Sequence, residues 1–283
     1  MSDGSHPGLP GMGIAARRLG RNQNGYYGDT IDISAVVREC EQLARSHGWQ
    51  VDYIRSAPKP DLLALTRMAP PNIAQPTRVY LSAGIHGDEP AGPLAVRQLL
   101  LENRWPAHMS LWICPCLNPT GFPINRRENA EGRDLNRQYL QPEAREIASH
   151  IAWLERQPDF DFCLCLHEDW EAHGFYLYEL NPDGRPSRAD AILKAVGEEC
   201  PIDPSEVIEG RPAQQGLIRP STDPRSRPDW PEAFYLVTHK TRLSYTFETP
   251  SDFALDVRVA AQVRGVNAAL RFPAGANAER QAE

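Results

Sequence analysis

A histidine and a glutamate stand three positions apart, at His86 and Glu89, in a glycine-rich turn. The turn follows an apolar stretch with strand character, residues 79–81, and precedes a segment with helical character, residues 91–101. An imidazole nitrogen and a carboxylate oxygen held this close are half of a typical Zn²⁺ site, because zinc takes N and O ligands in tetrahedral geometry. The alternative interpretation is a surface turn that holds one histidine and one glutamate by chance. The rest of the chain must supply the other ligands.

Two further candidate groups follow apolar strands at their carboxyl ends. His167 follows the strand predicted for residues 160–166, and Glu248 follows the alternating stretch 242–247. Ligands of open α/β sheets gather beyond the carboxyl ends of the strands, so we expect these groups to meet the first pair. His167 completes a set of two histidines and one carboxylate, which leaves a fourth zinc position for water. Glu248, a carboxylate outside that set, is a candidate general base.

The elements that must position these groups alternate along the chain. Strands are predicted for residues 50–55, 62–66, 77–83, 109–114, 160–166, 174–180 and 242–247. Helices are predicted for residues 34–47, 91–101, 142–155, 188–200, 230–238 and 251–270. This alternation predicts an open α/β sheet covered on both faces. The irregular segment 118–139 is long for a compact domain, and such segments are more often functional than not.

Composition limits the class of protein. The chain has 283 residues, of which 41% are hydrophobic, which is enough for a substantial core. We predict one large α/β domain, residues 31–272. Residues 1–30 are expected to be loosely ordered and residues 273–283 to form a disordered tail. The net charge of −7 argues against a nucleic-acid partner. Neither a secretory signal nor an apolar run long enough for a membrane span is visible, so a cytoplasmic protein is the default expectation.

Two groups of residues leave alternatives open. Cys114 and Cys116, like Cys163 and Cys165, are spaced to face one side of a strand, and buried free thiols are favoured over a metal site or disulfides. The segment 201–231 contains four arginines, which are either solvated loop charge, the favoured interpretation, or part of an anion-binding lid. They are Arg211, Arg219, Arg225 and Arg227.

An ordered set of motifs resembles the zinc carboxypeptidase family over residues 77–250. The motifs are His86-Gly-Asp-Glu89, Asn118-Pro-Thr-Gly121, Gly132-Arg-Asp-Leu-Asn136-Arg137, Leu166-His167 and Tyr245-Thr-Phe-Glu248. The His-x-x-Glu pair has little specificity alone, whereas the ordered set is strongly specific. The resemblance implies a three-layer α/β/α fold with a mixed, mostly parallel central sheet.

The resemblance also implies roles for individual residues. His86, Glu89 and His167 would bind one Zn²⁺ ion, and Glu248 would be the general base. This assignment contains two features that catalytic zinc sites need. One is an open fourth position at the metal, and the other is a separate carboxylate that transfers protons.

The remaining motif residues are implied to bind substrate or to support the metal site. Asn136 and Arg137 would hold the terminal carboxylate of the substrate, since a guanidinium binds a carboxylate in a bidentate fork. Arg127, which fits the family spacing better than Arg126, would stabilise the oxyanion. Asp134 would orient the first zinc-binding histidine from behind.

Departures from the family pattern bear on the substrate. Digestive carboxypeptidases carry an arginine just before the zinc-binding glutamate, whereas this chain has Asp88. His-Gly-Asp-Glu resembles instead the murein peptide amidases and the succinylglutamate desuccinylase/aspartoacylase branch. The tyrosine of the digestive enzymes has no clear counterpart, because Tyr235 lies too near Glu248 in sequence. Glu168 and Asp169 are unexpected acids, either of which could tune the metal or repel acidic ligands. His173 is a loop histidine, the favoured interpretation, or an additional ligand.

Three functions remain open from the sequence. The first choice is a zinc metallopeptidase of the carboxypeptidase type that cleaves an amide bond next to a free carboxylate in short or cell-wall-derived peptides. The second is an N-acyl amino acid deacylase, and the third is a noncatalytic zinc- or peptide-binding relative. The retained Glu248 disfavours the third, because such relatives usually lose the general base. The expected partner is a small peptide or N-acyl amino acid, not a nucleic acid or a membrane.

Overall fold

The computed structural model describes residues 16–22, 25–56, 60–223 and 227–271. Its main sheet contains eight strands in the order β1-β2-β4-β3-β5-β10-β6-β9, and β7 pairs with β8 apart from it. The strands are β1 (Gln50–Ile54), β2 (Leu62–Arg67), β3 (Thr77–Ala83), β4 (Met109–Cys114), β5 (Phe162–Asp169), β6 (Tyr176–Leu180), β7 (Val207–Ile208), β8 (Arg211–Pro212), β9 (Leu217–Ile218) and β10 (Ser244–Pro250). The central strands β4, β3, β5 and β10 are parallel. β2 pairs antiparallel to β1 and β4, and β6 pairs antiparallel to β10 and parallel to β9.

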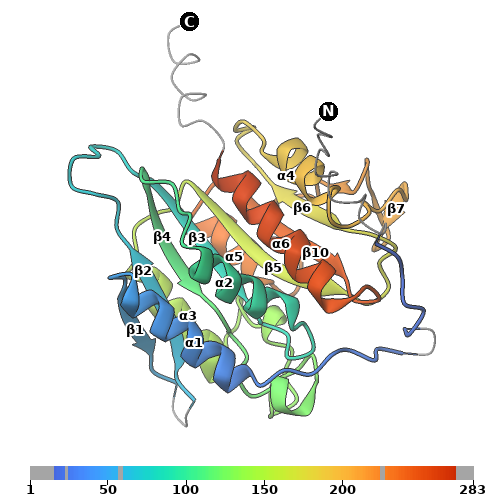
Figure 1. Cartoon of the computed structure of the whole chain (residues 1–283), viewed down its shortest axis with the longest axis horizontal. Helices are drawn as coiled ribbons and strands as arrows, with labels where there is room; N and C mark the ends of the chain where they lie inside the picture. Colours follow the sequence, from blue (N-terminus) through green and yellow to red (C-terminus); the bar gives the residue numbers. More distant parts are fainter. Residues whose placement is uncertain (1–15, 23–24, 57–59, 224–226, 272–283) are drawn as a thin grey trace, which may run out of the picture.

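Helices cover both faces of this sheet (Figure 1). The helices are α1 (Ile33–Ser46), α2 (Ala91–Glu102), α3 (Arg145–Glu155), α4 (Ala189–Val196), α5 (Glu232–His239) and α6 (Leu255–Leu270), with short 3-10 turns at η1 (Phe122–Ile124) and η2 (Leu135–Arg137). One face packs on α1, α2, α4 and α6, and the other packs on α3 and α5. The three-layer α/β/α fold with a mixed, mostly parallel sheet is therefore confirmed.

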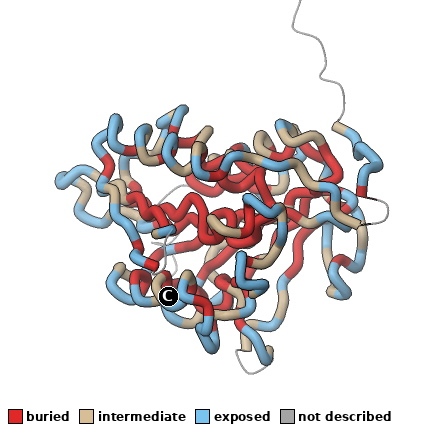
Figure 2. Tube along the Cα trace, turned by 90° about the horizontal axis from the view of Figure 1, so that it is seen from below, coloured by how far each residue is buried: buried red, intermediate tan, exposed pale blue. Residues whose placement is uncertain are grey.

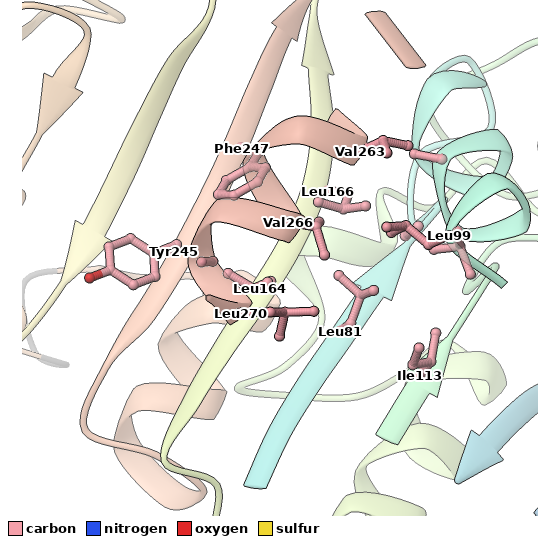
Figure 3. Packing of buried hydrophobic residues seen from close by; sticks show 14 of the residues in the cluster. Leu81, Leu99, Ile113, Leu164, Leu166, Tyr245, Phe247, Val263, Val266 and Leu270 are labelled. Carbon is pink, nitrogen blue, oxygen red and sulfur yellow. The ribbon is translucent and has the colours of Figure 1, made fainter. Parts of the chain in front are cut away.

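The buried residues form a continuous band through the middle of the molecule, between exposed helical surfaces (Figure 2). On the α6 side, Leu164 and Leu166 of β5 and Phe247 of β10 pack against Val263 and Val266 (Figure 3). Close packing of this kind holds the strands in one register, because a slip by one residue would turn every apolar side chain to the wrong face.

The same alternation decides where the polar side chains of β5 and β10 point. Since Leu164 and Leu166 face α6, His167 faces the opposite side of the sheet. Glu248 is the direct register partner of His167 across the parallel pair, so both side chains lie on that side. The sequence pattern thus delivers both groups to one end and one face of the sheet.

Several local predictions differ from the structure. Asp32, rather than Ser34, caps α1 by accepting a hydrogen bond from the Ala35 amide at 3.0 Å. Helix α6 begins at Leu255, and the amide of Ser251 instead donates to a carbonyl of β5. β5 continues to Asp169, so His167 lies inside the strand and not after it.

All six cysteines are buried and free, as favoured from the sequence. Cys163 and Cys165 face the same side of β5, but Cys114 and Cys116 lie in the cores on opposite faces of the sheet. The prediction of a shared side was wrong for the second pair, because β4 ends at Cys114 and the bend at Pro115 breaks the alternation.

The predicted single domain and its loosely ordered ends stay predictions, and residues 1–15 and 272–283 lie outside the described part of the chain. Within that part, residues 18–21 bind the turn between β10 and α6: the amides of Gly20 and Arg21 donate to the carboxylate of Asp252 at 3.1 and 2.8 Å. The described residues include no helix that is both long and apolar enough to cross a membrane.

Candidate active site

His86, Glu89 and His167 converge at the carboxyl end of the parallel strands. The Nδ1 atom of His86 lies 2.5 Å from one carboxylate oxygen of Glu89, and that of His167 lies 3.0 Å from the other. The two Nδ1 atoms are 3.3 Å apart. All three side chains are buried, and one potential ligand atom from each lies within 4.8 Å of the others. Two imidazole nitrogens and a carboxylate oxygen that face a common point are a donor set suited to zinc.

The turn that carries the first two of these residues depends on close contact with the segment after β4. A side chain at Gly87 would place its Cβ 2.2 Å from the carbonyl carbon of Gly121. At Gly84 the backbone has φ 61°, a conformation that glycine adopts without strain. The glycines in this motif therefore allow the loop 118–128 to pack directly on the turn.

Asp134 and Arg127 lie behind and beside this cluster. The Nε2 atom of His86 is 3.5 Å from a carboxylate oxygen of Asp134. Arg127 donates from Nε to Asp134 at 2.9 Å, and its Nη1 lies 3.3 Å from Nδ1 of His86 and 3.9 Å from Glu89. Asp134 also accepts a hydrogen bond from the amide of Asn136 at the start of η2. One carboxylate thus orients the histidine, the arginine and the next turn.

Asn136 and Arg137 sit on the η2 turn. The side-chain oxygen of Asn136 accepts a hydrogen bond from the amide of Glu232 at 2.8 Å, which leaves its NH₂ group to donate. The Arg137 guanidinium donates to the carbonyl of Asn136 at 3.0 Å, and its side chain is exposed. Both residues line the same cavity as the His/Glu cluster.

This cavity has a volume of about 520 Å³. Seven of the eight residues predicted from the sequence line it: His86, Glu89, Arg127, Asn136, Arg137, His167 and Glu248. The eighth, Asp134, lies behind His86 and is not among the lining residues. The irregular segment 118–139 therefore supplies groups to the site, and the strands and turns deliver the predicted groups to one place.

The acidic groups of the site have strongly perturbed pKa values. Burial raises the pKa of Glu89, but the charges of His86 and His167 outweigh this effect and hold it well below its usual range. Burial raises the pKa of Glu248 well above its usual range, although the charge of His167 opposes the shift. Burial and the neighbouring Glu89 raise the pKa of Asp88 to about 6. Carboxylates pushed in opposite directions within one cavity are typical of acid–base sites.

Other predicted candidates lie elsewhere or act differently. His173 is outside the His/Glu cluster. Glu168 accepts a hydrogen bond from the amide of Ala91 at 2.6 Å and forms an ion pair with the buried guanidinium of Arg258. Tyr235 packs on Tyr139 and does not line the cavity.

The sequence did not single out the tyrosines of the cavity. Tyr176 and Tyr178 of β6 line it, and so does Tyr26, whose hydroxyl donates to the carbonyl of Asp88. The signal for the first two was their alternate spacing on a predicted strand, since residues two apart face one side. Tyr26 offered no such signal, because it lies 62 residues from its partner in a segment predicted to be loose.

Two of the four arginines in the segment 201–231, Arg211 and Arg227, also line the cavity. Arg219 instead forms a 2.6 Å ion pair with Glu179, and Arg225 lies outside the described residues. Arg211 and Arg227 therefore lie at the site, and the choice between solvated loop charge and an anion-binding lid stays a prediction.

Parts of the chain are similar to known proteins. Residues 75–209 match the family model of the succinylglutamate desuccinylase/aspartoacylase catalytic domain. Glu248 lies beyond the matched residues. Over 84 residues, 23% of this chain, the sequence is 37% identical to carboxypeptidase SOL1 of Arabidopsis thaliana. That match spans 16% of the length of the plant protein.

Solved structures have the same fold. A protein assigned as a metallopeptidase from Shewanella baltica is 25% identical, with a TM-score of 0.70 over 83% of this chain and 90% of its own. A metallo-carboxypeptidase from Burkholderia cenocepacia is 16% identical, with a TM-score of 0.65 over 86% of this chain and 70% of its own. The family model and these relatives together support a hydrolase of the metallocarboxypeptidase or succinylglutamate desuccinylase/aspartoacylase type. They confirm the resemblance predicted from the sequence, to the zinc carboxypeptidase family and to its succinylglutamate desuccinylase/aspartoacylase branch.

Proposed function

We propose that this chain is a zinc-dependent hydrolase that cleaves an amide bond next to a free carboxylate, as a carboxypeptidase of short or cell-wall-derived peptides. The observation that carries the proposal is one cavity lined by the His/Glu cluster, by Glu248 and by the Asn136–Arg137 pair. A metal site, a proton-transferring group and a carboxylate-binding pair are the parts that such a reaction needs.

His86, Glu89 and His167 would hold the metal. The geometry supports the fit of these residues to a metal ion. The two buried Nδ1 atoms lie 3.3 Å apart, next to one carboxylate. Because two buried nitrogen lone pairs this close repel each other, a proton or a cation is needed between them. When bound there, zinc supplies Lewis-acid chemistry, which polarises a carbonyl and makes water acidic near neutral pH. The carboxylate of Asp134 behind His86 would fix the ring orientation.

The remaining steps belong to the side chains of the chain itself. Glu248 takes the proton of the attacking water and later delivers it to the leaving amine. Burial raises the pKa of Glu248, which makes this carboxylate a stronger proton acceptor than an exposed one. Arg127 stabilises the negative charge that develops on the carbonyl oxygen. Asn136 and Arg137 hold the carboxylate of the leaving part, which places the scissile bond beside Glu248.

The deacylase alternative has support of its own, because the matching family model describes succinylglutamate desuccinylase and aspartoacylase. Both reactions would use the same residues and differ in what lies on the acyl side of the bond. A panel of C-terminally free dipeptides, γ-glutamyl-diaminopimelate peptides and N-acyl amino acids separates them by kcat/KM.

Glu248→Gln is the sharpest test of the proposal. The amide keeps the shape but cannot accept the proton, so kcat should fall by about 10²–10⁴-fold on the best substrate of the panel. The bound zinc, measured by atomic absorption, should stay at one ion per chain, whereas His86→Ala should lower it. Glu198→Gln removes an exposed carboxylate that pairs with Arg264 and serves as the matched control. Full activity of Glu248→Gln would exclude this residue as the base, and wild-type protein that hydrolyses no panel member would point to the noncatalytic alternative.

A further inference from the structure

Helix α6 carries two fully buried polar side chains. Arg258 and Gln262 stand four residues apart, so they lie on the same face of the helix. The rest of the buried face is apolar, with Val263 and Val266 packed on β5 and β10 (Figure 3). Because a buried polar group costs stability unless it is paired, the partners of these two side chains show what they contribute.

Gln262 joins two neighbouring strands near their ends. Its Nε2 atom donates to the backbone carbonyl of His167 in β5 at 2.9 Å and to the hydroxyl of Thr249 in β10 at 2.9 Å. That hydroxyl donates in turn to the same carbonyl at 3.2 Å. The side-chain amide, the hydroxyl and the carbonyl therefore form a closed triangle of hydrogen bonds between α6, β5 and β10.

This triangle lies directly behind two groups of the proposed site. Thr249 follows Glu248, and Glu248 is the register partner of His167. Since side chains alternate along a strand, Glu248 and His167 face the cavity while Thr249 faces α6. Glu168, which follows His167, forms its ion pair with Arg258 on that same helix. Helix α6 therefore holds both strands at the residues that carry the proposed ligand and the proposed base.

The other end of the Gln262 amide lies outside the triangle. Its Oε1 atom is buried and has no hydrogen-bond partner among the described residues. A buried oxygen left unpaired costs stability, whereas methionine would fill a similar space without that cost. The stability of the core therefore does not explain the amide at this position, but a role in holding the two strands does.

We propose that Gln262 and Thr249 are positioning residues, which hold His167 and Glu248 at the separation that metal binding and proton transfer need. The inference rests on the proposed function, in which these two groups bind the metal and move the proton. Such groups have to be held within about 0.5 Å of their working positions, and the residues that support them supply this precision.

Gln262→Met separates this role from a contribution to the core. The variant of the full chain should bind zinc about 3- to 10-fold more weakly, the size of one net hydrogen bond, in competition with a fluorescent chelator. At saturating zinc, kcat on the best panel substrate should fall by a similar factor. KM should stay as in wild type, because the carboxylate-binding pair lies on η2 and not on these strands.

The urea unfolding midpoint of the metal-free variant should be unchanged or higher than that of wild type. The Thr249 hydroxyl still donates to the His167 carbonyl, so the substitution leaves no group of the triangle unpaired and removes the unpaired oxygen. Gln42→Met makes the same substitution on the exposed surface of α1 and should change neither zinc affinity nor kcat.

Thr249 offers a matched pair of variants. Thr249→Ser keeps the hydroxyl and should leave zinc affinity and kcat near those of wild type. Thr249→Val keeps the shape of the side chain but loses the hydroxyl, so it should lower both.

Zinc affinity and kcat equal to wild type in both Gln262→Met and Thr249→Val would overturn the positioning role. A lower urea midpoint of Gln262→Met with unchanged zinc affinity would also overturn it, because that is the result of a purely structural role. If both variants bind zinc more weakly but wild-type protein hydrolyses no panel substrate, the positioning role stands and the proposed hydrolase function fails.

Discussion

Asp134 connects a proposed metal ligand, His86, to two other groups of the site. It lies 3.5 Å from His86, accepts from Arg127 and caps the η2 turn that carries Asn136. The charges and hydrogen bonds of His86 and Arg127 outweigh burial and hold the pKa of Asp134 well below its usual range. It is therefore ionised at neutral pH, as a carboxylate that supports a metal-binding histidine has to be.

Asp134→Ala should weaken zinc binding about 10- to 100-fold, because the histidine loses the partner that fixes its orientation. Competition with a fluorescent chelator measures the zinc dissociation constant. Asp134→Asn keeps an oxygen that can cap η2, so it should have a smaller effect. Glu131→Gln removes a neighbouring exposed charge that pairs with Arg133 and should leave zinc affinity as in wild type. Equal affinities in all four proteins would show that Asp134 does not support the metal.

At the scale of elements, α6 is joined to β5 by a buried ion pair as well as by apolar packing. Arg258 is fully buried, pairs with Glu168 and Asp29, and donates from Nε to the carbonyl of Phe253 at 3.0 Å. Glu168 follows the proposed ligand His167 in the strand and also accepts from the first residue of α2. One carboxylate thus ties together three elements that surround the site.

Arg258→Met should destabilise the fold by about 3–5 kcal/mol, since it leaves the carboxylate of Glu168 buried without its cation. Urea unfolding with a chelator present measures this change apart from metal binding. The double variant Arg258→Met, Glu168→Gln removes both charges and should recover a large part of the loss. Arg264→Met, at an exposed pair with Glu199 on the same helix, should change stability by less than about 1 kcal/mol. A single variant as stable as the control would show that the pair contributes nothing.

At the scale of the whole molecule, a polar network crosses the buried layer between the sheet and α5. His150 is bracketed by the hydroxyls of Tyr80 at 2.9 Å and Tyr139 at 2.8 Å. The Tyr80 hydroxyl donates in turn to the carboxylate of Glu232. The backbone amide of Glu232 donates to the side-chain oxygen of Asn136. The packing of the core against α5 therefore helps to position a residue of the cavity.

Global stability should depend on pH through this network. Burial lowers the pKa of His150 to about 3 from 6.5, so below pH 6.5 the unfolded chain binds a proton that the folded chain does not. Stability from this group is present above pH 6.5 and is lost as pH falls toward 3, by about 2 kcal/mol between pH 6.5 and 5.

His150→Gln keeps hydrogen-bonding groups but does not titrate. The difference in unfolding free energy between the metal-free wild type and the metal-free variant should therefore shrink by about 2 kcal/mol as pH falls from 6.5 to 5. A constant difference between them would show that His150 is not buried in its neutral form.

Much of the site was predictable because its signals are local. The spacing of His86 and Glu89, the alternation along β5 and the apolar stretch before Glu248 are short-range patterns, and each follows from the period of a strand or the geometry of a turn. The boundaries of β3 and β4 were predicted to the residue for the same reason. The caps of α1 and α6 were not: Asp32 and not Ser34 caps α1, and α6 begins after Ala254 without a side-chain cap. Helix ends are harder to locate from sequence than helix centres.

The sequence by itself determined the α/β class, the set of candidate ligands and their placement toward the carboxyl ends of the strands, although His167 and Glu248 lie within the last paired residues and not after them. Only the tertiary structure decided which distant groups complete the cavity: Tyr26 from the first described segments, Tyr176 from an antiparallel strand, and Arg211 and Arg227 from an irregular segment. Tyr26, Arg211 and Arg227 carry no periodic signal, and the alternate spacing of Tyr176 and Tyr178 does not show which strand lies beside their own. Their positions depend on how separate segments pack, and packing is a property of the whole core and not of any short stretch.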